Sequence, residues 1–231
     1  MGTIQEHNRL SVVIPTLNAA AELPATLGAL ANGTLVREII ICDGDSHDAT
    51  VQIAREAGAQ VVSAPRGRGL QLAAGAAAAS GTWLLFLHAD CRPVPGWEEA
   101  VAAHVAAPDA AARAGYFGLV LDDMAPAARR LERVVAWRCR ALALPYGDQG
   151  LLIARALYEA IGGFASIPLM EDVDLVRRLG RDRLAALPAT ACASARRYRQ
   201  GGYLRRPLRN LACLSLYFAG LPPRHIARLY G

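Results

Sequence analysis

Short apolar runs alternate with amphipathic segments through the first ninety residues of the chain. Runs rich in Val, Ile and Leu, bounded by polar residues or proline, are typical of buried strands and occur at 10–14, 38–42, 60–63 and 83–87. Apolar residues on one helical face predict helices at 22–31, 49–57 and 70–80. This alternation predicts an α/β fold with a mostly parallel central sheet and helices on both faces.

The second half of the chain has a less regular pattern. It predicts strands at 115–121 and 150–153, and helices at 126–142, 170–179 and from 210 to 218, with a short helix ending at Gly162-Gly163. No low-complexity linker or internal repeat separates the halves. We therefore expect a single domain over residues 1–231, with one half at about 10–110 and the other at about 111–231.

Composition and charge narrow the classes of partner. Apolar residues make up 53% of the 231 residues and charged residues 19%, which suits a folded domain with a full core. The formal net charge is +5 and the chain has no lysine, so guanidinium groups, which bind phosphate bidentately, supply the positive charge. The arginines lack the aromatic interleaving of a single-strand groove, and we expect no nucleic-acid partner.

The cysteines and the apolar stretches indicate a cytoplasmic protein. Cys42, Cys91, Cys139, Cys192 and Cys213 form no CxxC pair and no zinc-like spacing, so we expect reduced thiols. Residues 1–9 lack the apolar stretch of a signal peptide, and the longest apolar run, 211–221, is too short to cross a bilayer. We expect a soluble or peripheral protein.

Three polar segments follow predicted strands. They are Pro15-Thr16-Leu17-Asn18, the turn 43–48 and His88-Ala89-Asp90. Because ligands of open α/β sheets bind at the carboxyl ends of the strands, these segments are the first candidates for a site.

Each candidate has a functional and a structural interpretation. Asp43 ends a strand, where its carboxylate can accept hydrogen bonds from a base or ribose, whereas Asp48 is placed to cap the next helix. His88 and Asp90 lie two residues apart on the same side and could share a divalent cation or contact a diphosphate. The alternative is a capping aspartate beside a partly buried histidine.

Arginine clusters and an acidic pair offer further chemistry. Arg66 and Arg68 alternate with glycines before a helix, as in a diphosphate clamp or a merely exposed loop. Glu171-Asp172 at a helix start can complement the helix dipole or supply a general base. The arginines of 196–199 and 205–209 suit either the neutralisation of a leaving nucleoside diphosphate or a solvated or lipid-facing surface.

Taken in order, these motifs resemble the family 2 glycosyltransferases of the GT-A fold over roughly residues 10–230. The matching segments are Val12 to Asn18, Asp43 to Thr50, His88-Ala89-Asp90, Gly147-Asp148-Gln149-Gly150 and Met170-Glu171-Asp172. The resemblance implies that Pro15, Thr16, Asn18, Asp43, Arg66, Arg68, His88, Ala89 and Asp90 bind the nucleotide sugar. It implies a nucleotide-sugar-binding half at about 10–110, with Arg197 as a further nucleotide-sugar ligand. It also implies an acceptor half at about 111–231, with an acceptor loop at Asp148 and Gln149.

Two positions depart from the family pattern. The chain is more narrowly similar to a small bacterial subgroup that carries Phe-Leu-His-Ala-Asp, here 86–90, and Ser-Ala-Arg-Arg, here 194–197. His88 stands where most relatives have the first aspartate of Asp-x-Asp. Arg197 is expected in the region where some relatives have a histidine that binds the metal.

The resulting hypothesis is inverting transfer from a UDP- or GDP-type sugar to an unknown acceptor hydroxyl. Asp172, or Glu171 in another register, would be the general base, and Asp90 would hold Mg²⁺ or Mn²⁺. Arg68 or Arg197 would stabilise the leaving group. The alternatives are a nucleotidyltransferase acting on a sugar phosphate and a catalytically degenerate nucleotide-sugar-binding protein.

The C-terminal apolar residues Leu211, Leu214, Phe218 and Leu221 leave two interpretations open. They would seal the core or a homodimer interface, or they would contact the inner face of a membrane that presents a lipid-linked acceptor.

Overall fold

The computed structural model describes residues 9–31 and 33–230. Residues 1–8, most of the segment expected to contain no signal peptide, lie outside the described residues.

The first half of the chain forms four parallel strands. They are β1 (Leu10–Thr16), β2 (Val36–Asp43), β3 (Gln60–Ser63) and β4 (Trp83–Phe86), in the spatial order β3-β2-β1-β4. All seven residues of β1 are buried because a strand at the centre of a parallel sheet is covered on both faces. These strands confirm the prediction drawn from the apolar runs.

The sheet continues into the second half of the chain. Its other strands are β5 (Cys91–Pro93), β6 (Ala114–Leu121), β7 (Leu151–Ala154) and β8 (Leu184–Ala193), and the full order is β3-β2-β1-β4-β7-β6-β8-β5. Only β7 and β5 run antiparallel to their neighbours, so the eight-stranded sheet is mixed but mostly parallel, as predicted.

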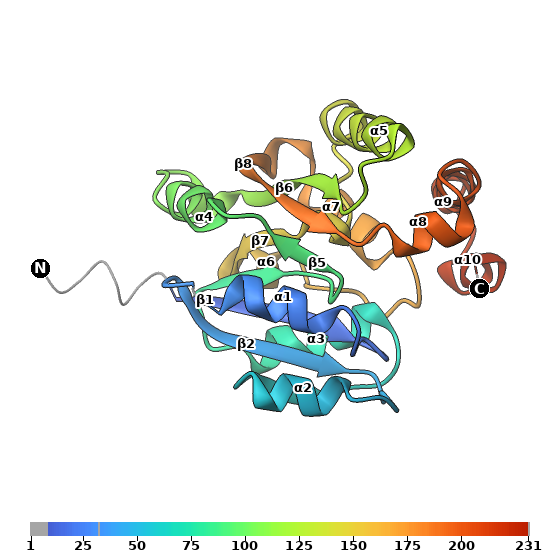
Figure 1. The fold of residues 1–231 in the computed structure, drawn as a ribbon. Helices are drawn as coiled ribbons and strands as arrows, with labels where there is room; N and C mark the ends of the chain where they lie inside the picture. The colour runs from blue at the N-terminus through green and yellow to red at the C-terminus, as the bar shows by residue number, and fades with distance from the viewer. Residues whose placement is uncertain (1–8, 32, 231) are drawn as a thin grey trace, which may run out of the picture.

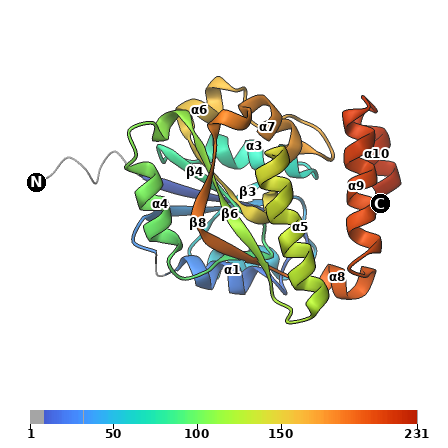
Figure 2. The same ribbon diagram turned by 90° about the horizontal axis from the view of Figure 1, so that it is seen from above.

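Helices cover both faces of the sheet. They are α1 (Leu23–Leu30), α2 (Thr50–Glu56), α3 (Arg68–Ala78), α4 (Trp97–Val105), α5 (Pro126–Leu142), α6 (Arg155–Ala160) and α7 (Glu171–Leu179), with short 3₁₀ turns at Ala110–Ala112, Gly147–Gln149 and Arg181–Arg183. Figure 1 shows α1 in front of the sheet, and Figure 2 shows α3, α6 and α7 on the opposite side. The predicted helices of the first half and the helix at 126–142 are confirmed.

Sequence patterns missed β5, α4 and β8. β8 is rich in alanine and contains Pro188, so its composition does not suggest a strand. The proline is tolerated because the register between β6 and β8 shifts there: Tyr116 pairs with Ala186, but Gly118 pairs with Thr190. An irregularity of this kind removes the need for a proline N–H in the ladder.

Three helices close the chain beside the carboxyl ends of the strands (Figure 1). They are α8 (Arg196–Gly201), α9 (Arg205–Phe218) and α10 (Pro223–Tyr230). α9 begins five residues earlier than predicted. Of the four apolar residues singled out in the sequence, Leu214 is buried and Leu221 packs against a small core cluster, whereas Leu211 is 57% exposed and Phe218 47%.

All five cysteines are free. Among the described residues, no helix combines the length and the hydropathy that crossing a bilayer requires.

Candidate active site

The carboxyl ends of β1, β2 and β4 meet at one edge of the sheet. β1 lies between the other two strands, and Thr16 at its end pairs in register with Asp43 at the end of β2. The segment His88-Ala89-Asp90 follows β4 at the same edge. The structure therefore places side by side the three segments that the rule of strand ends selected in the sequence.

The Asp43 carboxylate links the ends of β1 and β2 at this edge. Its Oδ1 accepts hydrogen bonds from the Thr16 hydroxyl at 2.9 Å and the Ser46 hydroxyl at 2.6 Å, and its Oδ2 accepts the Ser46 N–H at 2.8 Å. The side chain is buried and is not among the residues that line the two cavities described below. These bonds orient Thr16 and leave acceptor capacity on Oδ2, so contact of Asp43 with a base stays a prediction.

Two loops at this edge are joined by side-chain to backbone hydrogen bonds. Asn18 is in the left-handed conformation at φ 50°; its N–H donates to Ser46 Oγ and its Oδ1 accepts the His47 N–H, both at 2.8 Å. Asp48 accepts hydrogen bonds from the N–H groups of Ala20 and Thr50. The segments after β1 and β2 thus form one rigid wall.

Arg66 belongs to this wall and does not line the cavities. Its guanidinium donates to the Gly44 and Asp45 carbonyls at 3.2 and 3.3 Å and pairs with the exposed Asp45 carboxylate at 3.3 Å. As a diphosphate ligand it would exchange these exposed partners for phosphate, and this role of Arg66 stays a prediction.

Gln71 is a contributor that the sequence analysis missed. This α3 side chain is 3% exposed, and its Nε2 donates to the carbonyls of Thr16 at 2.7 Å and Cys42 at 2.8 Å. It satisfies backbone acceptors where β1 and β2 end. The signal in the sequence was a single glutamine on the otherwise apolar face of the helix.

The turn after β4 is anchored by three hydrogen bonds. The Ala89 carbonyl accepts the Thr26 hydroxyl at 2.8 Å, the His88 carbonyl accepts the Cys91 N–H, and the Asp90 carbonyl accepts the Ser194 N–H. These bonds use the backbone and leave both polar side chains of the turn directed into the cavities.

An outer groove of about 580 Å³ runs over this edge. Segments from five parts of the chain line it: Pro15, Thr16, Leu17, Asn18, Ala19, Glu22, Gly67, Arg68, Gln71, His88, Ala89, Asp90, Pro168, Ser194, Arg196, Arg197 and Gln200. Its volume is within the range of sites for small molecules and cofactors.

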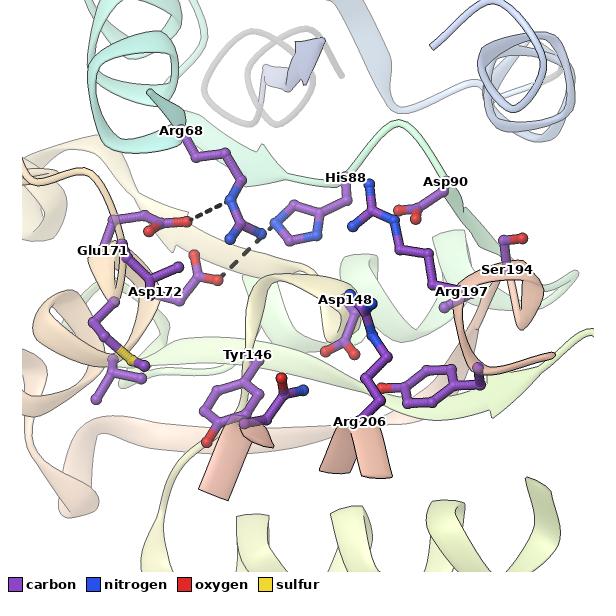
Figure 3. A pocket seen from close by; sticks show the side chains of 16 residues that line it. Arg68, His88, Asp90, Tyr146, Asp148, Glu171, Asp172, Ser194, Arg197 and Arg206 are labelled. Atoms are coloured by element: carbon purple, nitrogen blue, oxygen red, sulfur yellow. Dashed lines mark ion pairs between the residues drawn. The ribbon is translucent and has the colours of Figure 1, made fainter. Parts of the chain in front are cut away.

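An inner pocket of about 140 Å³ adjoins the groove (Figure 3). The two cavities share Arg68, His88, Asp90, Ser194 and Arg197. The other residues of the pocket are Tyr146, Asp148, Leu169, Met170, Glu171, Asp172, Val173, Ala193, Tyr198, Arg206 and Asn210. Tyr146, Tyr198 and Asn210 were not predicted as site residues, because they come from elements that no recognisable motif connects to the strand ends.

Asp172 faces His88 across the inner pocket. Its Oδ2 accepts the Gly147 N–H at 2.9 Å and lies 4.0 Å from His88 Nε2 (Figure 3). Both side chains are 17% exposed, and His88 Nε2 is buried without a hydrogen-bond partner in the described chain. A β-carbon at Gly147 would collide with both side chains, so glycine is needed to bring them this close.

Glu171 lies in the wall of the inner pocket and is 1% exposed. Its Oε1 lies 3.0 Å from Arg68 Nε, an ion pair without hydrogen-bond geometry. Burial, reinforced by the neighbouring Asp172 charge, raises the pKa of Glu171 to about 7 despite the opposing effect of Arg68. A buried, paired carboxyl group is badly placed to receive a proton from a substrate.

The predicted acceptor loop divides into two roles. Asp148 lines the inner pocket, and burial raises the pKa of its carboxyl group. Gln149 does not reach the pocket: its Nε2 donates to the Phe117 carbonyl and its Oε1 accepts from Arg138, both at 3.0 Å. The expectation for Gln149 is therefore corrected, because its amide is used inside the fold to hold the loop.

Asp90 fits a cation that a diphosphate also coordinates. Its backbone carbonyl is bonded, but its carboxylate enters no hydrogen bond or ion pair with the described residues. The described residues contain no group of three or more His, Cys, Asp or Glu suited to a metal. Mg²⁺ commonly binds through one or two carboxylates together with substrate phosphates and water, and this donor set suits that arrangement.

Arg197 comes from α8 and lines both cavities. Figure 3 shows its side chain extending toward His88 and Asp90. In the described chain it has no ion-pair partner, unlike Arg68. A helix more than a hundred residues beyond the turn thus places a positive charge beside Asp90.

Comparison with known proteins agrees with this arrangement. Residues 11–155 match the sequence model of the family described as Glycosyl transferase family 2. The PGL/p-HBAD biosynthesis glycosyltransferases of Mycobacterium tuberculosis and Mycobacterium bovis are 40% identical over 95 residues, which cover 35% of this chain and 34% of theirs. The match thus spans about a third of the length of these curated relatives.

Solved structures with the same fold cover more of the chain. Staphylococcus aureus TarS, solved as residues 1–349 and also with UDP-GlcNAc, has a TM-score of 0.65 at 17% identity, covering 96% of this chain and about 70% of that one. Glucosyl-3-phosphoglycerate synthase of Mycobacterium tuberculosis, in complex with Mn²⁺, UDP and glucosyl-3-phosphoglycerate, has a TM-score of 0.57 at 22% identity, covering 82% and 71%. At these identities the likeness shows the fold.

Proposed function

Because the chain belongs to glycosyl transferase family 2, we propose that it transfers a sugar from a nucleoside-diphosphate sugar to an acceptor hydroxyl with inversion at the anomeric carbon. One observation carries the proposal: a weakly exposed carboxylate, Asp172, faces the wall shared by a large groove and a smaller pocket. The groove would hold the donor and the pocket the acceptor.

The donor would lie along the outer groove. Thr16 and Asn18, held in place by the hydrogen-bonded wall, line the nucleotide end, and Asp90 with Arg197 lines the end shared with the inner pocket. Solved structures of similar fold contain UDP, UDP-GlcNAc or UDP with Mn²⁺, which supports a UDP-type donor and a divalent cation. A GDP-type donor remains the alternative.

Asp90 would hold Mg²⁺ or Mn²⁺, which, when bound, would neutralise charge on the diphosphate. Arg197 would add a guanidinium that forms no ion pair with another side chain of the described chain. Together they would stabilise the anion that departs.

Asp172 would act as general base. Its carboxylate takes the proton of the acceptor hydroxyl, the acceptor oxygen bonds to the anomeric carbon from the face opposite the diphosphate, and the bond from that carbon to the diphosphate oxygen breaks. The nucleoside diphosphate leaves with the electron pair. The Gly147 N–H holds the carboxylate in position, while Glu171 anchors Arg68.

The test is Asp172→Asn, with Asp182→Asn as the matched control on an exposed surface outside both cavities. We expect the first variant to lose about 10²–10⁴-fold in kcat with donor affinity largely unchanged, and the control to behave as the wild type. Near-normal turnover of Asp172→Asn would overturn the assignment of the base.

Product analysis separates the proposed reaction from its alternatives. Release of nucleoside diphosphate from a sugar nucleotide supports transfer, and release of pyrophosphate from a nucleoside triphosphate with a sugar phosphate would indicate a nucleotidyltransferase. Nucleotide binding that ignores Mn²⁺, without turnover, would indicate a degenerate binding protein. We place the enzyme in the cytoplasm, with a lipid-linked acceptor and a homodimer as further hypotheses.

A further inference from the structure

Positive and negative side chains are unevenly divided along the chain. Residues 183–231 contain nine arginines and no aspartate or glutamate, whereas residues 1–182 contain sixteen arginines and all twenty acidic residues. The formal side-chain charge is therefore +9 in the last 49 residues and −4 in the rest. Such asymmetry is typical of a segment that meets an anionic partner.

An exposed apolar stripe follows one face of α9 and the residue before it. Leu204 is 73% exposed, Leu208 54%, Leu211 57% and Phe218 47%. The spacing of four, three and seven residues places these side chains on one helical face. Cys213 on the opposite face, and Leu214 at the edge of the stripe, are buried against α7, α10 and nearby loops.

Exposed arginines border this stripe. Arg205 and Arg209 lie one residue beyond Leu204 and Leu208, so they flank one edge. At its far end Arg177 lies over the Phe218 ring, 4.9 Å from the centroid. α10, packed against α9 (Figure 2), adds exposed Arg224, Arg228 and Leu229, the last 63% exposed.

We propose that this surface, Leu204, Leu208, Leu211 and Phe218 with Arg205 and Arg209, binds the headgroup region of an anionic lipid bilayer. Leucine and phenylalanine would enter the boundary of the acyl chains while the guanidinium groups meet lipid phosphates, as in helices that lie in a membrane interface. A second copy of the chain fits less well, because a self-contact here would bring arginines of like charge together.

The surface is connected to the inner pocket through the same helices. α8 and α9 contribute Arg197, Tyr198, Arg206 and Asn210 to the pocket wall, and the Tyr198 and Tyr203 rings stack at 5.6 Å between the two helices. Attachment would therefore hold the pocket beside the lipid surface. If the proposed transfer is correct, this arrangement favours an acceptor whose hydroxyl is carried on a lipid.

The experiment is co-sedimentation of the whole chain with vesicles of phosphatidylcholine, with and without phosphatidylglycerol. We expect binding to the anionic vesicles only, and at least a tenfold loss of binding in Leu208→Gln/Leu211→Gln. Met124→Gln, which changes an 89% exposed apolar side chain elsewhere, is the control and should bind normally. Arg205→Gln/Arg209→Gln should weaken binding and reduce its salt dependence.

Three results would overturn the inference. The first is absence of binding to anionic vesicles, and the second is a dimer in solution that the leucine variant dissociates while vesicles remain unbound. The third is undiminished binding of the leucine variant with quenching of Trp137, the exposed tryptophan of α5, by brominated lipid. All readouts are independent of turnover, so failure of the proposed reaction would leave this test intact.

Discussion

The two ends of the active site are built on opposite principles. At the strand ends, polar side chains bond to one another and to backbone: Asp43 binds Thr16 and Ser46, and Gln71 binds two carbonyls. The C-terminal helices instead bring arginines without any acidic residue among them and leave large apolar side chains exposed. The first region is complete in itself, and the second has a surface suited to a partner.

This difference indicates how the work is divided. A site that must hold a nucleotide in a fixed pose benefits from a rigid wall, because the cost of ordering it has been met by folding. A wall formed by helices that rest on few contacts can adjust to an acceptor. Arg197 and Asp90 lie where the two regions meet. Neutralising either side chain therefore tests how much each region contributes to turnover.

Among the tests that compare these two regions, the largest effect is expected for Asp90→Asn. It removes the carboxylate proposed to hold the cation, so kcat should fall by about 10²–10³-fold, and added Mn²⁺ should no longer strengthen nucleotide binding in calorimetry. Chelation of metal should bring the wild type to the same level. Glu99→Gln, which changes an exposed acid on α4, is the control. If neither chelation nor Asp90→Asn lowered turnover, stabilisation of the leaving diphosphate would be due to Arg197 alone.

Glu171→Gln should change how stability depends on pH. The pKa of Glu171 in the folded state, about 7, lies above its ordinary value of 4.5, so the folded state binds the proton more tightly. The contribution of Glu171 to the free energy of unfolding is therefore fully present below pH 4.5 and is lost as the pH rises through 7. The variant should lack this decline, with a difference of up to about 3 kcal/mol at pH 8. Denaturant unfolding across pH 5–8 measures it, with Glu159→Gln as control; parallel profiles would contradict the argument.

Gln71→Leu should weaken the donor end without touching the pocket chemistry. Leucine preserves the volume but leaves the Thr16 and Cys42 carbonyls without their side-chain donor, at a cost of about 1–3 kcal/mol. Urea unfolding should report this cost, while Gln52→Leu on the surface of α2 should be neutral. An unchanged midpoint for Gln71→Leu would show that the wall does not depend on this side chain.

The smallest effect is expected for Tyr203→Phe in the C-terminal region. The Tyr203 hydroxyl donates to Asp123 at 2.7 Å and ties the α8–α9 junction to the segment before α5. Its loss should accelerate amide exchange in α8 and α9 while the melting temperature hardly moves, because this region unfolds locally. A global loss of stability instead would mean that the two regions are as rigid as each other.

The first half of the fold could be predicted from the sequence because buried parallel strands are continuous apolar runs, such as Val12 to Ile14. β8 could not, because alanines and Pro188 obscure it and its place is set by partner strands. The same limit applies to the site. His88 and Asp90 could be located by the rule of strand ends, but Gln149 was given a ligand role because a sequence does not show which polar atoms the fold itself uses.

The pairing of β4 with the much later strand β7 affects the nascent chain during synthesis. Once Phe86 has been synthesised, strands β1 to β4 can pair with one another while the rest of the chain is still being made. The outer edge of β4 then stays unpaired until Leu151–Ala154 emerges to form β7. During that interval the ribosome-bound intermediate carries an open, apolar strand edge, the kind of edge that chaperones shield and that drives aggregation when synthesis stalls.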